Sequence, residues 1–599
     1  MLAKLPAKRL ELAFANGADD EFTKLCNQHK LYLPLADGRL LPLPGARLAP
    51  LLKALLGLVG PRRERLTNNT VKLHRADASA LAAFAGEAGM DLAWAANAKR
   101  LIELGDSLRR GRGLIAVAPA TSFHGKLRPY QADGLAWLDF LRDAAFGGVL
   151  ADDMGLGKTV QALAFLAREK EQGRLTKPAL IVCPTSVLPN WLSEAKQFAP
   201  TLAVLPLRGL DRRESFAAIP NSDLVITTYS LLARDHEVLL GHEFHAAILD
   251  EAQAIKNPKA TVSRLAHRID ARHRFALTGT PIENNLGEVW SLFEFLNPGL
   301  LGDETTFRRT LRIPIEKHGD AGAQAFLSRR LKPFMLRRTK EEVAKELPPK
   351  TEIIELIRLE GAQRDLYETV RSLMHAKVRN EIARKGLAKS HIVFLDALLK
   401  LRQICCDPRL LKLPQARHVR GSAKFERLME MIPELVSEGR RILLFSQFTS
   451  MLALIEEGIA ALKIPYVMLT GDTVDRTTPV RKFQTGKVPL FLLSLKAGGT
   501  GLNLTAADTV IHYDPWWNPA VENQATDRAH RIGQNKPVFV YKLIVREGIE
   551  GAIELLKSRK AALAEALFAN SAKTPLDLTE ADISALFVPL DYIPDRCAA

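Results

Sequence analysis

The glycine-rich stretch GGVLADDMGLGKT joins an apolar run to the residue types that bind phosphate. Gly155 and Gly157 allow backbone N–H groups to approach phosphate oxygens, and the N-terminus of a following helix favours negative charge. Lys158 can reach the β and γ phosphates of a nucleotide, and Thr159 can bind Mg²⁺. The usual pattern has glycine where this chain has Asp152, so a chance glycine turn before a helix remains the alternative.

A carboxylate pair, Asp250 and Glu251, ends a second apolar run in HAAILDEAQAIKN. Asp250 would hold Mg²⁺ through its water shell, and Glu251 would orient and deprotonate the water that attacks a γ phosphate. Acidic pairs at strand ends are usually solvated loop residues, and this pair taken alone is more consistent with that role. Together with Lys158 upstream, however, the pair favours a site for nucleotide hydrolysis.

Two arginines, Arg528 and Arg531, occur in QATDRAHRIGQ. Together with Gln524 they fall at spacings of four and three residues, which predicts one face of a helix. One of them is a candidate arginine finger that stabilises charge on the γ phosphate, and only a second lobe closing onto the first could deliver it. The alternative is an exposed basic helix face.

Short apolar runs alternate with helical stretches from about residue 127, which predicts parallel sheets with crossover helices. The first set is GGVLA, PALIVC, DLVITT, HAAILD and RFALT, and the second is RRILLFS, YVMLT, PLFLLS, DTVIHYD and VFVYKLI. We therefore expect an α/β fold of two lobes. Between about residues 285 and 420 the sequence shows no strand pattern, and long helical patterns such as AQRDLYETVRSLMHAKVRNEIARKG predict helices. Near the start, LYLPLADGRLLPLP predicts a hairpin that turns at Asp37 and Gly38.

Composition narrows the class of protein. Lysine and arginine number 83 against 67 acidic residues, a formal charge of +16, which favours a polyanionic partner but is equally consistent with solubility alone. The five cysteines lack zinc-site spacing, and Cys405 and Cys406 are interpreted as buried helix residues in preference to a redox pair. Without a secretory signal or an 18-residue apolar run, we expect a cytoplasmic chain, nucleoid-associated if bacterial, with no membrane partner.

Taken together, the motifs resemble those of the Swi/Snf family of DNA-dependent ATPases within helicase superfamily two. They follow the family's order over about residues 125–545: LRPYQ, DDMGLGKT, CPTSVLPNW, ITTYS, DEAQAIKN, LTGTPIEN, FMLRRTK, LRQIC, LLFSQF, LTGDT, SLKAGGTGLNL, DPWWNP and QATDRAHRIGQ. The family's phosphate loop looks like DxMGxGKT, so Asp152 fits it. The chain departs from the family at REGIEG, where relatives usually show an acidic threonine-led turn that braces the second lobe, and it lacks the zinc module of some bacterial relatives.

The resemblance implies specific site residues and two RecA-like lobes that bind ATP and Mg²⁺ in the cleft between them. Gln131 would read the adenine edge, Gly501 would border the nucleotide, and Thr278 and Thr280 would couple nucleotide state to DNA contacts. The residues implied to hold the phosphates are Asp153, Met154, Gly155, Leu156, Gly157, Lys158 and Thr159, with Arg528 and Arg531 completing the site. The residues implied to face the DNA backbone are Thr185, Ser186, Trp191, Thr228, Ser446, Gln447, Gly471, Ser494 and Lys496.

The implied domains are an amino-terminal mixed α/β region of unknown role (1–120), a first ATP-binding lobe (121–285), helical protrusions and a linker (286–420), a second lobe (421–570) and a tail (571–599). Residues 1–120 resemble the latter part of a longer amino-terminal region. The basic residues of the helical insertion would line a duplex or form a solvated helix face; they are Arg371, Lys377, Arg379, Arg384, Lys385 and Lys389. Trp516 and Trp517 are expected to pack within the lobe in preference to stacking on bases.

The function implied by the resemblance is ATP hydrolysis that drives translocation along double-stranded DNA, through backbone contacts that do not read sequence. A DNA-bound protein or an RNA polymerase would be a further partner, and the chain would act as a monomer. Two alternatives stay open. One is a strand-separating or RNA-directed helicase, and the other is a DNA-binding or polymerase-associated scaffold whose ATPase is idle.

Overall fold

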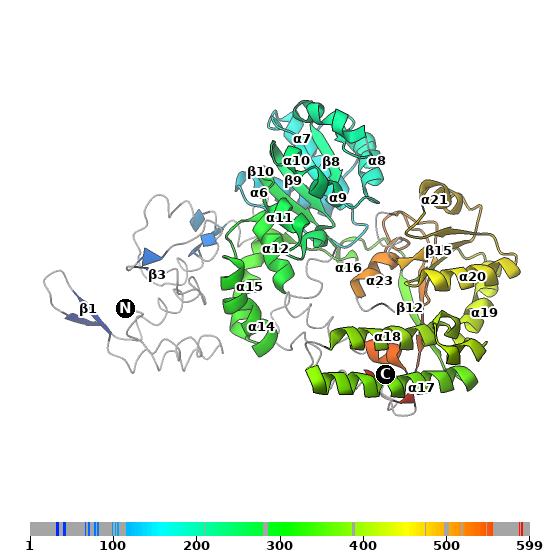
Figure 1. The fold of residues 1–599 in the computed structure, drawn as a ribbon. Coiled ribbons are helices and arrows are strands. Elements are labelled where there is room, and N and C mark those ends of the chain that lie inside the picture. The colour runs from blue at the N-terminus through cyan, green and yellow to red at the C-terminus, as the bar shows by residue number, and fades with distance from the viewer. Residues whose placement is uncertain are drawn as a thin grey trace. The chain divides into compact units, whose positions relative to one another are not determined.

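The computed structural model divides into two compact units, whose principal segments are Gly157–Thr339 and Lys340–Ala562 (Figure 1). It describes most of the chain between residues 116 and 554 and short segments on either side. The described residues are 31–34, 40–43, 66–67, 70–71, 77–78, 81–82, 99, 102–103, 105–106, 116–209, 211–279, 286–385, 390–473, 475–495, 502–514, 516, 519–546, 548–554, 586–587 and 589–590.

The first unit is built on a seven-stranded sheet of order β11-β5-β10-β9-β6-β8-β7, in which every pairing is parallel. Its strands are β5 (Gly148–Leu150), β6 (Ala179–Cys183), β7 (Val204–Pro206), β8 (Leu224–Thr228), β9 (Glu243–Asp250), β10 (Asp270–Leu277) and β11 (Met335–Leu336). Every residue of β5, β6 and β8 is buried, as expected for parallel strands with both faces covered. The five strands predicted for this lobe are confirmed, and β7 and β11 are additional.

Helices alternate with these strands. They are α6 (Pro129–Asp143), α7 (Lys158–Glu171), α8 (Leu188–Phe198), α9 (Tyr229–Arg234), α10 (His236–Leu239), α11 (Thr261–His267) and α12 (Leu286–Leu296). Local signals set their starts: α7 follows Gly157, whose left-handed φ of 79° suits glycine, and α9 follows Thr228, whose hydroxyl accepts a bond from Leu231 N. Each start places the preceding loop at the carboxyl end of a parallel strand, where such sheets bind ligands.

The first unit ends in a helical segment of α13 (Glu304–Phe307), α14 (Ile313–His318) and α15 (Ala321–Leu331). Asp303 and Asp320 cap α13 and α15 by accepting bonds from backbone N–H groups. Arg330 on α15 forms a buried ion pair with Asp77. Because Asp77 belongs to the amino-terminal region, this pair attaches part of that region to α15.

The expectation that strands are absent between residues 285 and 420 is wrong. β11 pairs with β5 in the first sheet, and β12 (Lys350–Ile357) pairs with β17 (Val538–Val545) in the second. β12 lies at the sheet edge, and its sequence KTEIIELI mixes charged and apolar residues because most of its side chains are exposed or half-buried. Edge strands of this kind lack the continuous apolar run by which buried parallel strands are recognised.

The second unit is built on a six-stranded parallel sheet of order β12-β17-β16-β13-β15-β14. Its other strands are β13 (Ile442–Ser446), β14 (Tyr466–Leu469), β15 (Leu490–Ser494) and β16 (Thr509–His512), and its flanking helices are α19 (Ala423–Ser437), α20 (Thr449–Ala461), α21 (Thr477–Gln484) and α23 (Pro519–Thr526). The five strands predicted for this lobe are confirmed. The two sheets together establish the expected α/β fold with two parallel-sheet domains.

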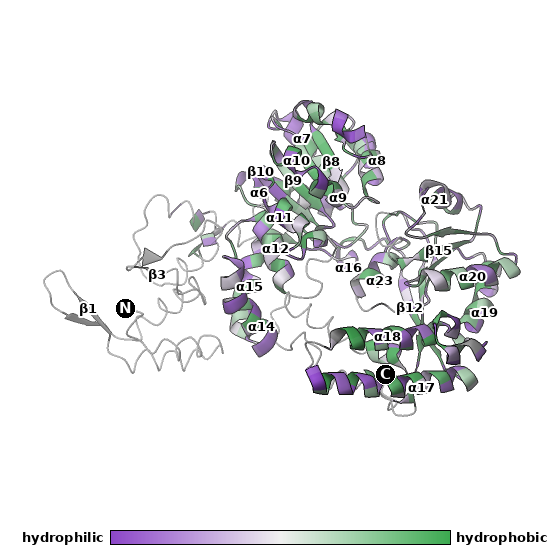
Figure 2. Ribbon diagram, viewed as in Figure 1, coloured by the Kyte–Doolittle hydropathy of each residue, from purple (hydrophilic) through white to green (hydrophobic). Residues whose placement is uncertain are grey.

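Two long helices, α17 (Gly361–Lys385) and α18 (His391–Cys406), lie side by side in the second unit (Figure 1). Hydrophilic and hydrophobic turns alternate along α17 (Figure 2), and its buried residues pack with Leu586 and Phe587. Cys405 and Cys406 are buried free thiols at the end of α18, and burial raises the pKa of both. Their interpretation as buried helix residues is therefore confirmed.

The predicted amino-terminal hairpin is confirmed in its strands. β1 (Leu31–Pro34) and β2 (Leu40–Leu43) pair antiparallel with Leu31 opposite Leu43. Its turn, at Asp37 and Gly38, lies outside the described residues. In the part of the chain that the structure describes, no helix combines the length and apolar character needed to cross a membrane.

A buried charge cluster in the first unit should make its stability depend on pH. His245 bonds Glu169 at 2.9 Å, Arg142 and Arg174 also pair with Glu169, and the ring of His273 lies 5.2 Å from that of His245. Burial, and then the proximity of His245, lowers the pKa of His273 to about 4. The folded protein therefore favours neutral His273, and this stabilisation is present above the usual value of 6.5 and is lost as pH falls toward 4.

We expect His273→Asn to weaken the fall in the thermal unfolding midpoint between pH 7.5 and pH 5, because asparagine cannot take up the proton. The measurement is a series of melting curves for the wild type and the variant across that range. The exposed histidine His124, replaced by asparagine, is the control and should leave the pH dependence unchanged. Parallel curves for the wild type and His273→Asn would show that His273 does not carry the effect.

Candidate nucleotide site and DNA-facing residues

The candidate phosphate loop follows β5, and two of its glycines have left-handed backbone angles. Gly155 and Gly157 adopt φ angles of 86° and 79°, a region that L side chains rarely adopt. A Cβ added at Gly157 would lie 2.5 Å from Gln131 Nε2, so the close approach of these two residues also favours glycine. Lys158 Nζ donates to the carbonyl oxygens of Asp152, at 2.5 Å, and Asp153, at 3.2 Å. The loop thus carries an ammonium group folded over its own backbone at a helix N-terminus.

Gln131 is buried against this loop. Its Oε1 accepts a bond from Arg128 N at 3.0 Å, and its Nε2 lies 3.4 Å from Tyr130 Oη. The side chain therefore caps α6 as well as contacting the loop at Gly157. Its implied contact with an adenine edge stays a prediction.

Asp250 ends β9 as an almost fully buried carboxylate. Its Oδ2 accepts a bond from Trp191 Nε1 at 2.8 Å, its Oδ1 accepts one from Glu251 N at 2.9 Å, and its carbonyl accepts one from Tyr229 Oη at 2.8 Å. Burial, reinforced by the negative charge of Glu251, raises the pKa of Asp250 to about 7, although the Trp191 bond and the charge of Lys158 oppose the shift. A nearby cation would restore the ionised form.

Glu251 has an unusual backbone conformation. Its φ is 49°, in the left-handed region that non-glycine residues seldom occupy outside constrained sites. Gln253 Nε2 donates to Glu251 Oε2 at 2.8 Å, and Thr278 Oγ1 donates to Gln253 Oε1 at 3.0 Å. A hydrogen-bonded chain therefore joins Thr278 of LTGTP to Glu251. The coupling implied for Thr278 stays a prediction, and Thr280 lies outside the described residues.

The residues present fit a magnesium ion bound together with a nucleotide. Among the described residues no group of three or more His, Cys, Asp or Glu side chains could hold a metal ion alone. Mg²⁺ in nucleotide sites usually takes one or two protein ligands and completes its shell with phosphates and water. The buried Asp250 carboxylate, whose charged form needs a compensating cation, and the Thr159 hydroxyl on α7 match that donor set.

The helix predicted for QATDRAHRIGQ ends before its arginines. α23 stops at Thr526, and Arg528 and Arg531 lie in the turns that follow, so they do not share a helix face with Gln524. The turn is held by Gln534 Nε2, which donates to the carbonyl oxygens of Thr505, Ala507 and Ala529. It closes at Gly533, whose φ is 100°. Their role with ATP remains a prediction, and Gly501 lies outside the described residues.

Two known protein families are similar to this chain. A family model for the SNF2-related domain matches residues 130–410, and a helicase conserved C-terminal domain matches residues 423–533. A solved structure, the SWI2/SNF2 ATPase core of Sulfolobus solfataricus in complex with dsDNA, is 36% identical, and the match covers 79% of this chain and 99% of that one, with a TM-score of 0.40. This chain belongs to the SNF2 family.

Two curated relatives are similar to this chain over most of its length. The putative ATP-dependent helicase/translocase YwqA of Bacillus subtilis is 43% identical over 478 residues, 78% of this chain and 51% of that protein. The TATA-binding protein-associated factor mot1 of Aspergillus fumigatus is 36% identical over 493 residues, 72% of this chain and 26% of that protein. The chain thus spans about half the length of YwqA and a smaller share of mot1.

Four of the DNA-facing positions implied by the SNF2 resemblance have buried side chains: Trp191, Thr228, Ser446 and Ser494. The prediction for Trp191 is wrong for its side chain, because the indole is fully buried and bonded to Asp250. Thr228 caps α9, Ser446 Oγ accepts a bond from Phe448 N, and Ser494 ends the buried strand β15. We correct all four: these side chains are buried within their own units and do not face a duplex.

The other DNA-facing positions are accessible or undescribed. Thr185 and Gly471 are exposed, and Ser186 and Gln447 are half-buried, with Gln447 N donating to the carboxylate of Asp514. Lys496 lies outside the described residues. For the accessible set, contact with DNA stays a prediction.

The basic residues of α17 divide between ion pairs and open surface. Arg371 pairs with Glu368 and donates to Phe587 O, and Arg384 and Lys385 both pair with Glu381. Lys377 and Arg379 are exposed, and Lys389 lies outside the described residues. The paired arginines favour the solvated-face interpretation for their part of the helix. Trp516 packs against the buried cluster of the second lobe, as expected, and Trp517 is outside the described residues.

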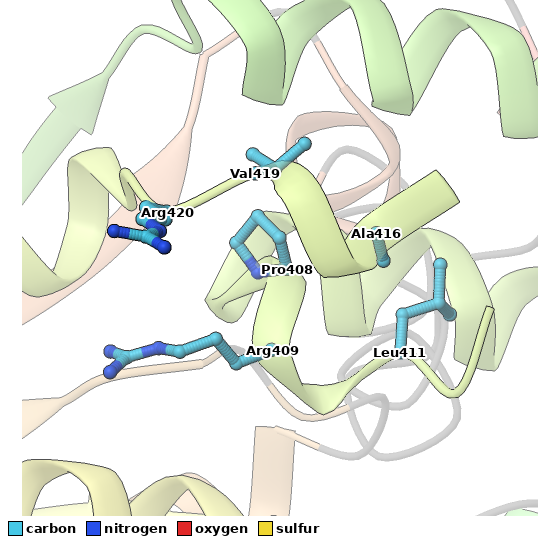
Figure 3. Close-up of a pocket in the computed structure, with 6 residues that line it drawn as sticks. All are labelled: Pro408, Arg409, Leu411, Ala416, Val419 and Arg420. Carbon is cyan, nitrogen blue, oxygen red and sulfur yellow. The ribbon is translucent and has the colours of Figure 1, made fainter. Parts of the chain in front are cut away.

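A pocket of about 480 Å³ lies in the second unit between α18 and α19 in sequence (Figure 3). Its lining residues are Pro408, Arg409, Leu411, Ala416, Val419 and Arg420. Arg409 is already held by a two-bond contact with Asp407. The pocket contains none of the predicted site residues, and we assign it no ligand.

Proposed function

We propose that this chain hydrolyses ATP in response to double-stranded DNA and uses the energy to translocate along the duplex. The observation that carries the proposal is the arrangement in the first unit, where the phosphate loop with Lys158 and the buried Asp250–Glu251 pair follow parallel strands of one sheet. Carboxyl ends of such strands meet at one edge, which is where α/β sheets bind nucleotides.

Each residue would have a separate chemical role. Lys158 and the loop N–H groups would bind the β and γ phosphates, and Asp250 with Thr159 would position Mg²⁺. Glu251, held by Gln253, would orient and accept a proton from the attacking water. Arg528 and Arg531 of the second lobe would meet the γ phosphate when the lobes close, and the alternating grip on DNA would move the protein along the backbone.

The comparisons support a duplex DNA substrate and a protein partner. The Sulfolobus core is described in complex with dsDNA, and the name of mot1 says that it associates with the TATA-binding protein. We propose that this chain acts on duplex DNA and displaces or remodels a DNA-bound protein or an RNA polymerase. We further propose that it works as a monomer in the cytoplasm, at the nucleoid if the protein is bacterial.

Translocation is tested by displacement of a third strand from a triplex. We expect ATP-dependent release of a triplex-forming oligonucleotide from duplex DNA, and no separation of the two duplex strands in a parallel assay with the same DNA. Release of a duplex strand, or activity on an RNA duplex, would favour the helicase alternative. Absence of triplex release with intact ATP turnover would reject translocation.

A further inference from the structure

Arg338 makes a dense set of contacts behind the phosphate loop. Its Nε donates to Asp152 Oδ1 at 2.8 Å, and its Nη2 donates to Asp152 Oδ2 and, at 2.9 Å, to Gln161 Oε1. Its Nη1 donates to Tyr130 O, and the guanidinium carbon lies 5.2 Å from the Tyr130 ring centroid. One side chain thus joins α6, the phosphate loop and α7.

The main chain reinforces the same junction. Ala151 N donates to Leu336 O at 2.7 Å, and Asp153 N donates to Arg338 O at 3.0 Å, so the segment after β5 runs beside β11 and its continuation. The partner carboxylate, Asp152, is fully buried, and Arg338 is nearly so, with 11% of its side chain exposed. A two-bond arginine–carboxylate contact in such a setting fixes orientation as well as distance.

Asp152 links this contact to the phosphate-binding lysine. Its carboxylate holds Arg338, while its backbone carbonyl accepts the bond from Lys158 Nζ. Gln161 closes the network, because its Nε2 donates to Asp152 Oδ2 at 3.2 Å and to Gly157 O at 3.3 Å. Gly134 on α6 permits the approach, since a Cβ there would lie only 1.9 Å from Gln161 Oε1.

We propose that Arg338 is a positioning residue for nucleotide binding, which holds Asp152 and so sets the backbone of the phosphate loop and the place of Lys158. The proposal rests on the proposed function in taking a nucleoside triphosphate as the ligand of that loop. Arg338 also lies just before Thr339, where the chain leaves the first unit. The segment that connects the two units therefore bears directly on the phosphate loop.

The test compares the affinity for a fluorescent ATP analogue, without DNA, among purified full-length variants. Arg338→Met should weaken binding about tenfold or more, and Arg338→Lys should fall between it and the wild type, because lysine keeps the charge but loses the planar two-bond geometry. Asp152→Asn should also weaken binding, and the double variant should be no weaker than the worse single variant, because both changes break one interaction. Arg329→Met, on the exposed face of α15, is the matched control and should bind within twofold of the wild type.

The thermal unfolding midpoint and the affinity for duplex DNA without nucleotide are measured alongside. The proposal predicts that nucleotide affinity falls for Arg338→Lys even where the midpoint is unchanged. It is overturned if Arg338→Met and Arg338→Lys bind the analogue as tightly as the wild type, if affinity falls only together with the unfolding midpoint, or if the two single effects add in full. ATP turnover by the wild type with duplex DNA is measured separately. If duplex DNA does not stimulate it, the proposed function is rejected, but the comparison of nucleotide affinities still tests the role of Arg338.

Discussion

Replacing Glu251 with glutamine should reduce ATP turnover by about 100-fold to 10,000-fold, the usual contribution of a positioned general base. The amide is nearly the same shape as the carboxylate but cannot accept a proton from the attacking water. Nucleotide binding should survive within about threefold, because Lys158 and the loop N–H groups do not depend on Glu251. The measurements are steady-state ATP turnover with duplex DNA and a direct binding titration with a fluorescent ATP analogue.

Glu243→Gln provides the matched control. Glu243 lies at the opposite end of the same strand, β9, where it is partly exposed and pairs with Arg272 and Lys177. That substitution should leave turnover within twofold of the wild type. If Glu251→Gln retained more than a tenth of wild-type turnover, the assignment of Glu251 as the base would be wrong.

Replacing Lys424 with methionine should destabilise the second unit by about 3–5 kcal/mol, the usual cost of removing one partner of a buried ion pair. Lys424 and Glu550 are both fully buried, with 2.6 Å between Nζ and Oε2, and Lys424 Nζ also donates to Tyr513 O at 3.0 Å. Loss of the ammonium leaves the carboxylate buried without its counter-charge. The measurement is the free energy of unfolding from denaturant titration, followed by a signal from the second unit.

Two further variants separate a broken pair from a general packing defect. The double variant Lys424→Met with Glu550→Met should recover part of the loss, because no uncompensated charge remains. Lys400→Met removes one partner of the surface pair with Asp396 on α18 and should cost less than about 1 kcal/mol. Equal losses for Lys424→Met and Lys400→Met would contradict the role of the buried pair.

Glu550 lies in REGIEG, the turn whose sequence departs from the family pattern, and its contacts show how this turn is held. Glu550 Oε2 accepts a bond from Val545 N at 2.9 Å and pairs with Lys424 at the start of α19. The turn therefore braces the end of β17 in this chain even though its sequence differs from the threonine-led form.

The sequence predicted the parts of the fold whose physical signal is local. Runs such as ALIVC and LFLL are apolar throughout because parallel strands covered on both faces exclude polar side chains, and both lie in internal strands of their sheets. The sequence did not predict β12 or β11, for different reasons. β12 is a largely exposed edge strand, and β11 has only two residues. Neither produces an apolar run that differs from its surroundings.

Residue types in the sequence were enough to predict a chemical role for the loop, but not the contacts that hold the loop in place. Lys158, Asp250 and Glu251 each follow an apolar run, and together their residue types and positions predict a chemical role for each. Arg338 is separated from Asp152 by 186 positions, and only the fold brings the two together. The prediction that Trp191 faces DNA was wrong because an aromatic residue in a loop motif is compatible both with stacking on nucleic acid and with a buried hydrogen bond, here to Asp250.

ATP turnover by the purified chain with no nucleic acid, single-stranded DNA, duplex DNA and RNA tests the central claim most directly. The account predicts low turnover without nucleic acid and strong stimulation by duplex DNA that disappears in Glu251→Gln. Stimulation by single strands or RNA in place of duplex DNA, or no turnover under any of these conditions, would contradict it.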